Sequence, residues 1–124
     1  MAGLFSNKET FNQDITGWDT INVTDMRRMF FYSGLFNQGI CEWDTSSATD
    51  MRGMFTYAFS FNQSIGEWNT AGVTLMSSMF EYAESFDQDL SLWCVDKIDN
   101  PPEHFSIGSP LSSAYQPSWG TCPS

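Results

Sequence analysis

The chain has 124 residues, of which 41% are hydrophobic and 16% aromatic, enough for a modest core within one domain. Fifteen acidic residues against five basic ones give a formal charge of -10, which disfavours nucleic acid and anionic membrane surfaces as partners. No stretch approaches the roughly 18 apolar residues that a membrane span needs. Residues 1–10 also lack the pattern of a secretory signal, so the chain alone is compatible with a cytoplasmic location.

Residues 1–10 resemble the second half of a repeat that first appears complete further on. Their apolar residues Met1, Leu4 and Phe5 fall in the same register as apolar residues of the later repeats. No polar cap precedes this segment, and an uncapped end of a repeat stack exposes its core layer. We therefore expect this first layer to associate, for instance as a homodimer through its outer face.

The octet "FNQDITGW" at Phe11 returns as "FNQGICEW", "FNQSIGEW" and "FDQDLSLW", each 25 residues after the last. The register holds without an insertion as far as Phe105. The full repeats are 11–35, 36–60 and 61–85, and the degenerate last repeat with its cap is 86–124. Identical apolar types at a fixed period indicate coils that stack and cover one another's cores within a single domain.

Each repeat divides into two halves with different patterns. The first half, Phe-Asn-Gln-x-Ile-x-x-Trp, carries β-favouring residues and predicts a short strand, which would pair in parallel from coil to coil. In the second half, Met26, Met29 and Phe30 have the i, i+3, i+4 spacing of one helical or 3-10 turn. Thr24 precedes this turn as a candidate N-cap. We therefore predict an α/β repeat solenoid, with a parallel β-helix-like solenoid as the alternative.

Polar positions that stay constant from repeat to repeat are expected to build the coil. One such column is predicted to form a ladder of stacked side chains that bond to one another and to the turn backbone. Its members are Asn12, Asn37, Asn62 and Asp87.

Columns that vary are free to carry specificity, so we expect a binding face on the strand half of the stack. Asp14, Gly39, Ser64 and Asp89 share one such column, while Gly17, Glu42 and Glu67 belong to another that continues at Leu92. The candidate face is therefore Asp14, Gly17, Gly39, Glu42, Ser64, Glu67 and Asp89. Non-enzymatic protein binding is the function that we expect.

The end of the chain is rich in Pro, Gly and Ser, which ends the repeating pattern and predicts a loop-rich cap. Cys94 and Cys122 bracket this segment, and a disulfide between them would close the cap over the last coil. We favour this pair over a bridge to Cys41, which occupies a column of unrelated residues and is expected to be a free thiol. A disulfide favours an oxidising compartment.

Catalytic and metal-binding patterns are weak. His104 is the one histidine, and no nucleophile triad, phosphate loop or zinc spacing is present, so we expect neither an enzyme nor a resident cofactor. A glycan-binding or hydrolytic domain, with a pocket around Glu42, Glu67 or His104, is the alternative. Stacked Asp25 and Asp50 keep calcium open as a ligand between coils.

Two further side-chain patterns have simpler explanations. The threonine columns could suggest an ice-binding face, although turns and caps explain them more simply. Arg27, Arg28 and Arg52 form the only basic cluster, which we expect to be solvated or paired with nearby aspartates.

The unit "FNQ…I…W…T…VTDM…MF" resembles the bacterial surface-protein repeat of about 25 residues found in lipoproteins and other surface proteins of Mycoplasma and other bacteria. The ending "SWGTCP", with the earlier "LWC", also resembles that family's C-terminal closure. The family is related to BspA-like leucine-rich repeats, and the resemblance implies a right-handed leucine-rich-repeat-like stack. It also implies a secreted or cell-surface location and a role in binding other proteins.

Overall fold

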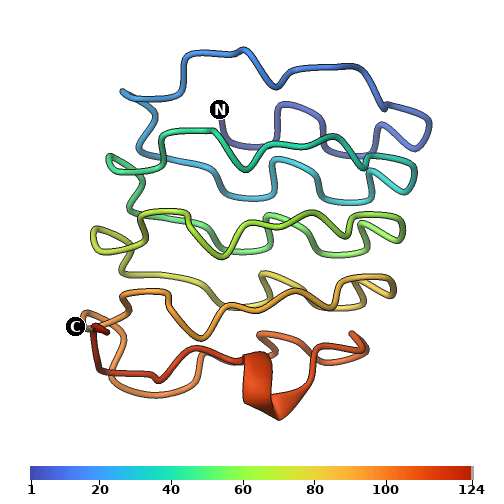
Figure 1. The fold of residues 1–124 in the computed structure, drawn as a ribbon. Coiled ribbons are helices and arrows are strands. Elements are labelled where there is room, and N and C mark those ends of the chain that lie inside the picture. The colour runs from blue at the N-terminus through green and yellow to red at the C-terminus, as the bar shows by residue number, and fades with distance from the viewer. Residues whose placement is uncertain (124) are drawn as a thin grey trace.

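The computed structural model describes residues 1–123 and shows a flat stack of coils in two layers (Figure 1). The Met layer comprises residues 1–8, 24–33, 49–58 and 74–83, and the Trp layer comprises residues 11–20, 36–45, 61–70 and 86–95. The chain passes between the layers at both ends of every coil, and residues 96–123 close the stack. The last position of the expected cap, 124, lies outside the described residues.

The core lies between the two layers and is made of stacked rings and thioethers. Phe55 stacks on Phe30 and on Phe80, with 5.5 Å between ring centroids in both pairs. It also stacks on Phe61 of the opposite layer at 4.1 Å. These parallel rings bury the core phenylalanines of the middle coils completely, whereas Trp18 of the first coil is 41% exposed. Each coil therefore supplies one layer of a continuous apolar core.

The Met layer is built from successive turns, so the predicted helical turn is wrong. The amides of the even-numbered residues 28–32 donate to carbonyls of the next coil at 2.9–3.0 Å, while those of the odd-numbered residues 29–33 donate to carbonyls three residues earlier. A helix would need every amide to bond four residues back. Arg28 and Tyr32 adopt φ of 50° and 58°, each at the third position of a turn. Two consecutive turns thus produce the apolar spacing that resembles a helix.

The expected threonine cap is also replaced by a link between coils. The amide of Thr49 donates to the carbonyl of Thr24 at 2.8 Å, and its hydroxyl donates to the same oxygen at 3.2 Å. Thr74 repeats both bonds on Thr49 at 2.9 and 3.3 Å. These threonines join one coil to the next instead of starting a helix.

The predicted parallel sheet is absent from residues 1–123. Strand-type pairing is limited to two isolated bridges, Asp25 with Asp50 and Asp50 with Leu75, and both lie where the Met layer begins. The one helix of the described part, 1–123, is a 3-10 helix, η1 (Ser113–Tyr115), in the closing segment. The α/β solenoid of leucine-rich-repeat kind and its β-helix-like alternative are therefore both wrong.

Side chains take the place of a backbone ladder in the Trp layer. The indole Nε1 of Trp43 donates to the carbonyl of Ile15 at 3.1 Å, and Trp68 makes the same bond to Ile40 at 3.0 Å. Each link spans 28 residues and is buried, and Trp93 repeats it on Ile65 at 3.0 Å, so these three tryptophans each fasten their own coil to the one before. The constant Trp column therefore fills the core and also replaces strand pairing.

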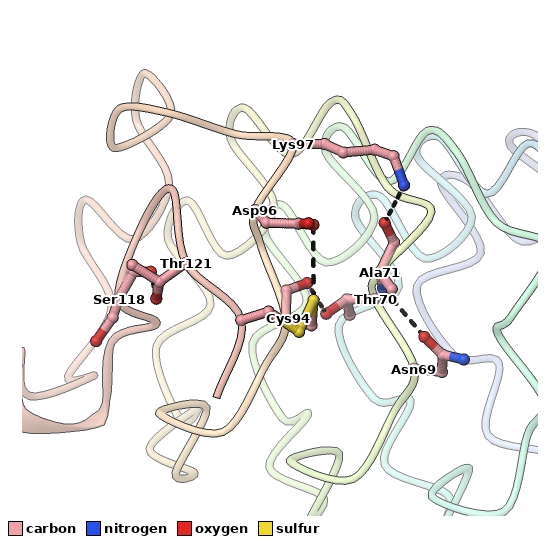
Figure 2. The surroundings of a disulfide bond; sticks show 9 residues. Asn69, Thr70, Ala71, Cys94, Asp96, Lys97, Ser118 and Thr121 are labelled. Carbon is pink, nitrogen blue, oxygen red and sulfur yellow. Dashed lines mark hydrogen bonds between the residues drawn. A yellow bond between two sulfur atoms is a disulfide. The ribbon is translucent and has the colours of Figure 1, made fainter. Parts of the chain in front are cut away.

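The closing segment is fastened by the predicted disulfide. Cys94 and Cys122 are bonded, which confirms the pairing, and Cys41 is free and exposed. Figure 2 shows this disulfide beside the hydroxyl of Thr70, which donates to the carbonyl of Cys94 at 2.8 Å. The ammonium of Lys97 reaches back to the carbonyl of Ala71 at 2.7 Å (Figure 2). The last coil is thus tied covalently to the cap and by hydrogen bonds to the coil before it.

Candidate functional site

In the Trp layer, a column of asparagine side chains holds neighbouring coils in register. The side-chain carbonyl of Asn12 accepts the backbone amide of Asn37 at 2.9 Å and the Nε2 of Gln38 at 3.1 Å. Asn62 bonds to Asn37 in the same way at 2.9 Å, and the amide of Asp87 bonds to Asn62 at 3.0 Å. Every coil is thus held in register directly beside the variable columns.

Aspartates of the variable column build turns. Asp14 accepts the amide of Thr16 at 3.0 Å and its hydroxyl at 2.6 Å, and these bonds hold the pKa of Asp14 below its ordinary value. Asp89 accepts the amide of Ser91 at 2.9 Å, and the hydroxyl and amide of Ser91 lower its pKa in the same way. Both carboxylates therefore remain charged at neutral pH while they shape the backbone.

A shallow hollow of about 370 Å³ lies on the outside of the Trp layer. Four of the seven residues of the candidate face line it, whereas Asp14, Gly17 and Gly39 do not. The lining residues are Cys41, Glu42, Ser64, Gly66, Glu67, Asp89 and Leu92. Sequence reasoning thus found the charged part of this hollow and missed Cys41 and Gly66, whose column varies just as strongly.

The hollow is acidic and has an apolar edge. Glu42, Glu67 and Asp89 make no ion pair within residues 1–123, so three negative charges face the same space without compensation. Leu92 is 72% exposed and adds an apolar side chain. A Cβ at Gly66 would collide with the carbonyl of Asp89, so glycine allows these two coils to approach. Such a surface attracts a cationic group with an aliphatic stem.

The residues considered for catalysis or metal binding lie near charged partners outside the hollow. His104 lies 3.9 Å from a carboxylate oxygen of Glu81 and 3.8 Å from one of Glu103, and it does not line the hollow. Asp25 and Asp50 bind the guanidinium groups of Arg27 and Arg52 at 2.8 and 2.7 Å. No group of three or more His, Cys, Asp or Glu side chains within residues 1–123 is placed to hold a metal ion.

One threonine column points inward instead of forming an outer face. Thr20, Thr45 and Thr70 are at most 1% exposed. Their hydroxyls donate to carbonyls of the next coil at 3.0, 2.9 and 2.8 Å. This column therefore offers no regular hydroxyl array to ice.

Together, the stacked coils and the variable outer hollow define a repeat domain. Residues 1–119 match the family model described as "Mycoplasma protein of unknown function, DUF285". The chain belongs to this family, and with it is a repeat domain of the surface type. No curated protein and no solved structure matches the chain. In the described part, 1–123, no helix is both long and apolar enough to cross a membrane.

Proposed function

We propose that this domain is a non-enzymatic binding module of a secreted or cell-surface protein, and that its acidic hollow receives basic side chains of a protein partner. The observation that carries this proposal is the convergence of Glu42, Glu67 and Asp89 on one hollow without a counter-charge among residues 1–123. Lys and Arg side chains complement both features of this surface, because the charged group meets the carboxylates and the stem packs on Leu92.

The chemistry of the hollow supports binding over hydrolysis. Proton transfer needs an acid or base whose pKa is tuned by burial or by a charged neighbour, and hydrolysis often adds a nucleophile beside it. Cys41 and Ser64 are the nucleophilic side chains here, and His104 is not part of the lining. Glu42 and Glu67 are both exposed to solvent. A glycan-binding or hydrolytic role has no comparable observation in its favour.

A titration with a basic peptide tests the proposal. The probe is a blocked Gly-Lys-Leu-Arg-Gly peptide, measured by calorimetry against the wild-type domain at low and at physiological salt. The double variant Glu42→Gln/Glu67→Gln should lose about tenfold in affinity, and the wild-type affinity should fall with added salt.

The matched control changes the same number of charges outside the hollow. Glu9→Gln/Glu103→Gln removes two exposed carboxylates that do not line it. This control should bind the peptide as the wild type does. Equal losses in both double variants would mean that net charge alone attracts the peptide, and the hollow would then have no role as a site.

A further inference from the structure

A second concave surface lies on the outside of the Met layer and shares no residue with the acidic hollow. It is a groove of about 590 Å³ that crosses four successive coils of the stack. Three columns line it: Ala2, Arg27, Arg52 and Ser77; Gly3, Arg28, Gly53 and Ser78; and Ser6, Phe31, Thr56 and Glu81. Three of the chain's five basic residues are gathered here, in a protein whose formal charge is -10.

Arg28 occupies a backbone position that favours glycine. Its φ is 50°, and the equivalent positions in the other coils are Gly3 at 64°, Gly53 at 63° and Ser78 at 59°. A residue with a Cβ in this left-handed conformation costs about 1–2 kcal/mol relative to glycine. The turn therefore accepts glycine at this position and does not require an arginine.

The neighbouring coil leaves room for the Arg28 side chain. A Cβ at Gly53 would lie 3.2 Å from Cγ of Arg28, so the side chain runs across this glycine. Its guanidinium carbon lies 5.2 Å from the ring centroid of Phe31, at a distance suited to cation–π stacking. Arg28 makes no ion pair within residues 1–123, so its planar face is fixed while its N–H groups stay free for a ligand.

The other two arginines are compensated. Arg27 binds Asp25 through Nη2 at 2.8 Å and reaches Asp50 with Nε at 3.5 Å, while Arg52 binds Asp50 at 2.7 Å. These pairs fix the wall of the groove and leave Arg28 as its uncompensated cation. Further along, Glu81 places a carboxylate with a 21% exposed side chain in the same groove. The groove is thus positive near Arg28 and negative near Glu81.

We propose that this groove binds an extended peptide that places a carboxylate on Arg28 and a cationic side chain on Glu81. A free guanidinium binds a carboxylate through two parallel N–H groups. Arg28 and Glu81 lie on coils two steps apart, or about 10 Å at the spacing of paired backbones. An extended peptide covers that length in about three residues. A polyanion fits less well, because Glu81, Asp25 and Asp50 would repel it.

A spectroscopic titration tests the proposal directly. The probe is the blocked peptide Gly-Asp-Ala-Ala-Lys-Gly, added to nitrogen-15-labelled protein while the Nε–H signal of Arg28 and the amide signal of Gly53 are followed. Both signals should shift with one common dissociation constant. Replacing either the Asp or the Lys of the peptide by Ala should weaken binding about tenfold, since each removes one charge-assisted contact.

Arg28→Gly separates binding from folding. Two other coils already carry glycine at this position, so the variant should melt at the wild-type temperature or above it while peptide affinity falls at least about tenfold. Lys97→Ala is the matched control, because it removes a positive charge outside the groove and should leave affinity unchanged. Glu81→Gln should weaken the Asp-Lys peptide but not the peptide in which Ala replaces Lys.

Three outcomes would overturn the assignment. The first is the absence of shifts at Arg28 and Gly53 at millimolar peptide, and the second is unchanged affinity in Arg28→Gly. The third is tighter, Arg28-dependent binding of a short oligodeoxynucleotide, which would identify a polyanion site instead. A negative result with the basic peptide at the acidic hollow leaves this proposal unaffected, because the two surfaces share no residue.

Discussion

The regular coils and the closing segment use the same types of side chain but hold them by different means. In the coils, ring lies parallel to ring, as Phe55 does on Phe80 with an interplanar angle of 6°. At the closing segment the next ring of that column, Phe105, turns edge-on to Phe80 at 81°. Trp119 then packs edge-on to Phe105 at 82°. A stack that grows by repetition thus ends where its rings stop being parallel.

The two regions also differ in what joins one layer to the next. Within the coils, backbone amides, asparagines and tryptophans repeat the same bonds at every step. The closing segment continues the Met-layer ladder, since the amides of Ser78, Phe80 and Tyr82 donate to its carbonyls at 2.7–2.9 Å, and it adds the disulfide on the side of the Trp layer. Pro101 stands in the column of Met26 and Met51, whose amides donate to the next coil, so it has no donor to offer. The coils are thus joined by repeated hydrogen bonds, and closure adds one covalent bond to them.

The largest difference between the regions should come from removing one ring. Phe55→Ala should cost about 3–5 kcal/mol, because the fully buried ring loses partners in the coils on both sides. Phe105→Ala should cost less, because Phe105 is already 5% exposed and its ring packs edge-on against Phe80. Urea denaturation of both variants measures the difference, and equal losses would show that the two regions pack alike.

Opening the disulfide should affect mainly the closing segment. Replacing Cys94 and Cys122 together by Ser should cost about 3 kcal/mol on the chain-entropy account, because the bond spans 28 residues. Hydrogen exchange should speed up in residues 96–123 and stay slow in the middle coils. Uniform loss of protection along the whole chain would mean that the coils depend on closure for their own stability.

The asparagine column allows a smaller, matched comparison. Asn37→Ala removes the acceptor of the Asn62 amide at 2.9 Å and of the Gln63 amide group at 3.0 Å, and should cost about 1–2 kcal/mol. Asp87 ends the column, and its carboxylate accepts no bond from residues 1–123. Asp87→Ala should therefore be nearly neutral in thermal unfolding. A comparable loss of stability in Asp87→Ala would contradict the bonding direction, in which each side chain accepts from the coil that follows it.

The smallest effect concerns pH and the turns of the coils. The hydroxyl and amide of Ser46 hold the pKa of Asp44 below its ordinary value. Its contribution to stability is therefore full above pH 3.8, the ordinary pKa of an aspartate, and is lost as the pH falls through the lower folded pKa. Asp44→Asn should reduce this acid sensitivity while it preserves the turn, since Asn69 makes the same turn with Ala71 at 3.1 Å. Thermal melts between pH 2 and 5 measure it; identical profiles for variant and wild type would contradict it.

The sequence was sufficient for the repeat, the core columns and the disulfide, because each depends on side-chain identity at a fixed period. It misled on secondary structure, since Met26, Met29 and Phe30 have a spacing that consecutive turns share with a helix. The signal that separates the two was present at Gly3 and Gly53, which stand in the column of Arg28 and mark a left-handed residue. Arginine at that position concealed the turn.

The two concave surfaces were foreseen unequally. Variation at Glu42 and Glu67 indicated the acidic hollow, because charge that changes from coil to coil serves no constant structural purpose. The groove around Arg28 was missed, because its arginines were expected to be solvated or paired with aspartates. Arg27 and Arg52 are paired and Arg28 is exposed without an ion pair among residues 1–123, and the sequence alone did not show which arginine has no carboxylate partner there. Self-association through the outer face of residues 1–10 stays a prediction, as does the relation to BspA-like repeats.

The ladder of the Met layer gives the whole stack an electrical polarity. Amides of Gly3, Arg28 and Gly53 all point toward the following coil, as do those of their even-spaced neighbours, while the intervening amides are turned aside into turns. In an ordinary sheet the peptide dipoles alternate and cancel. The dipoles of these ladder peptides add in one direction, as in a helix. Partial positive charge therefore lies at the closing edge and partial negative charge at the first coil. The backbone ladder by itself therefore favours anions at the closing edge and cations at the first coil.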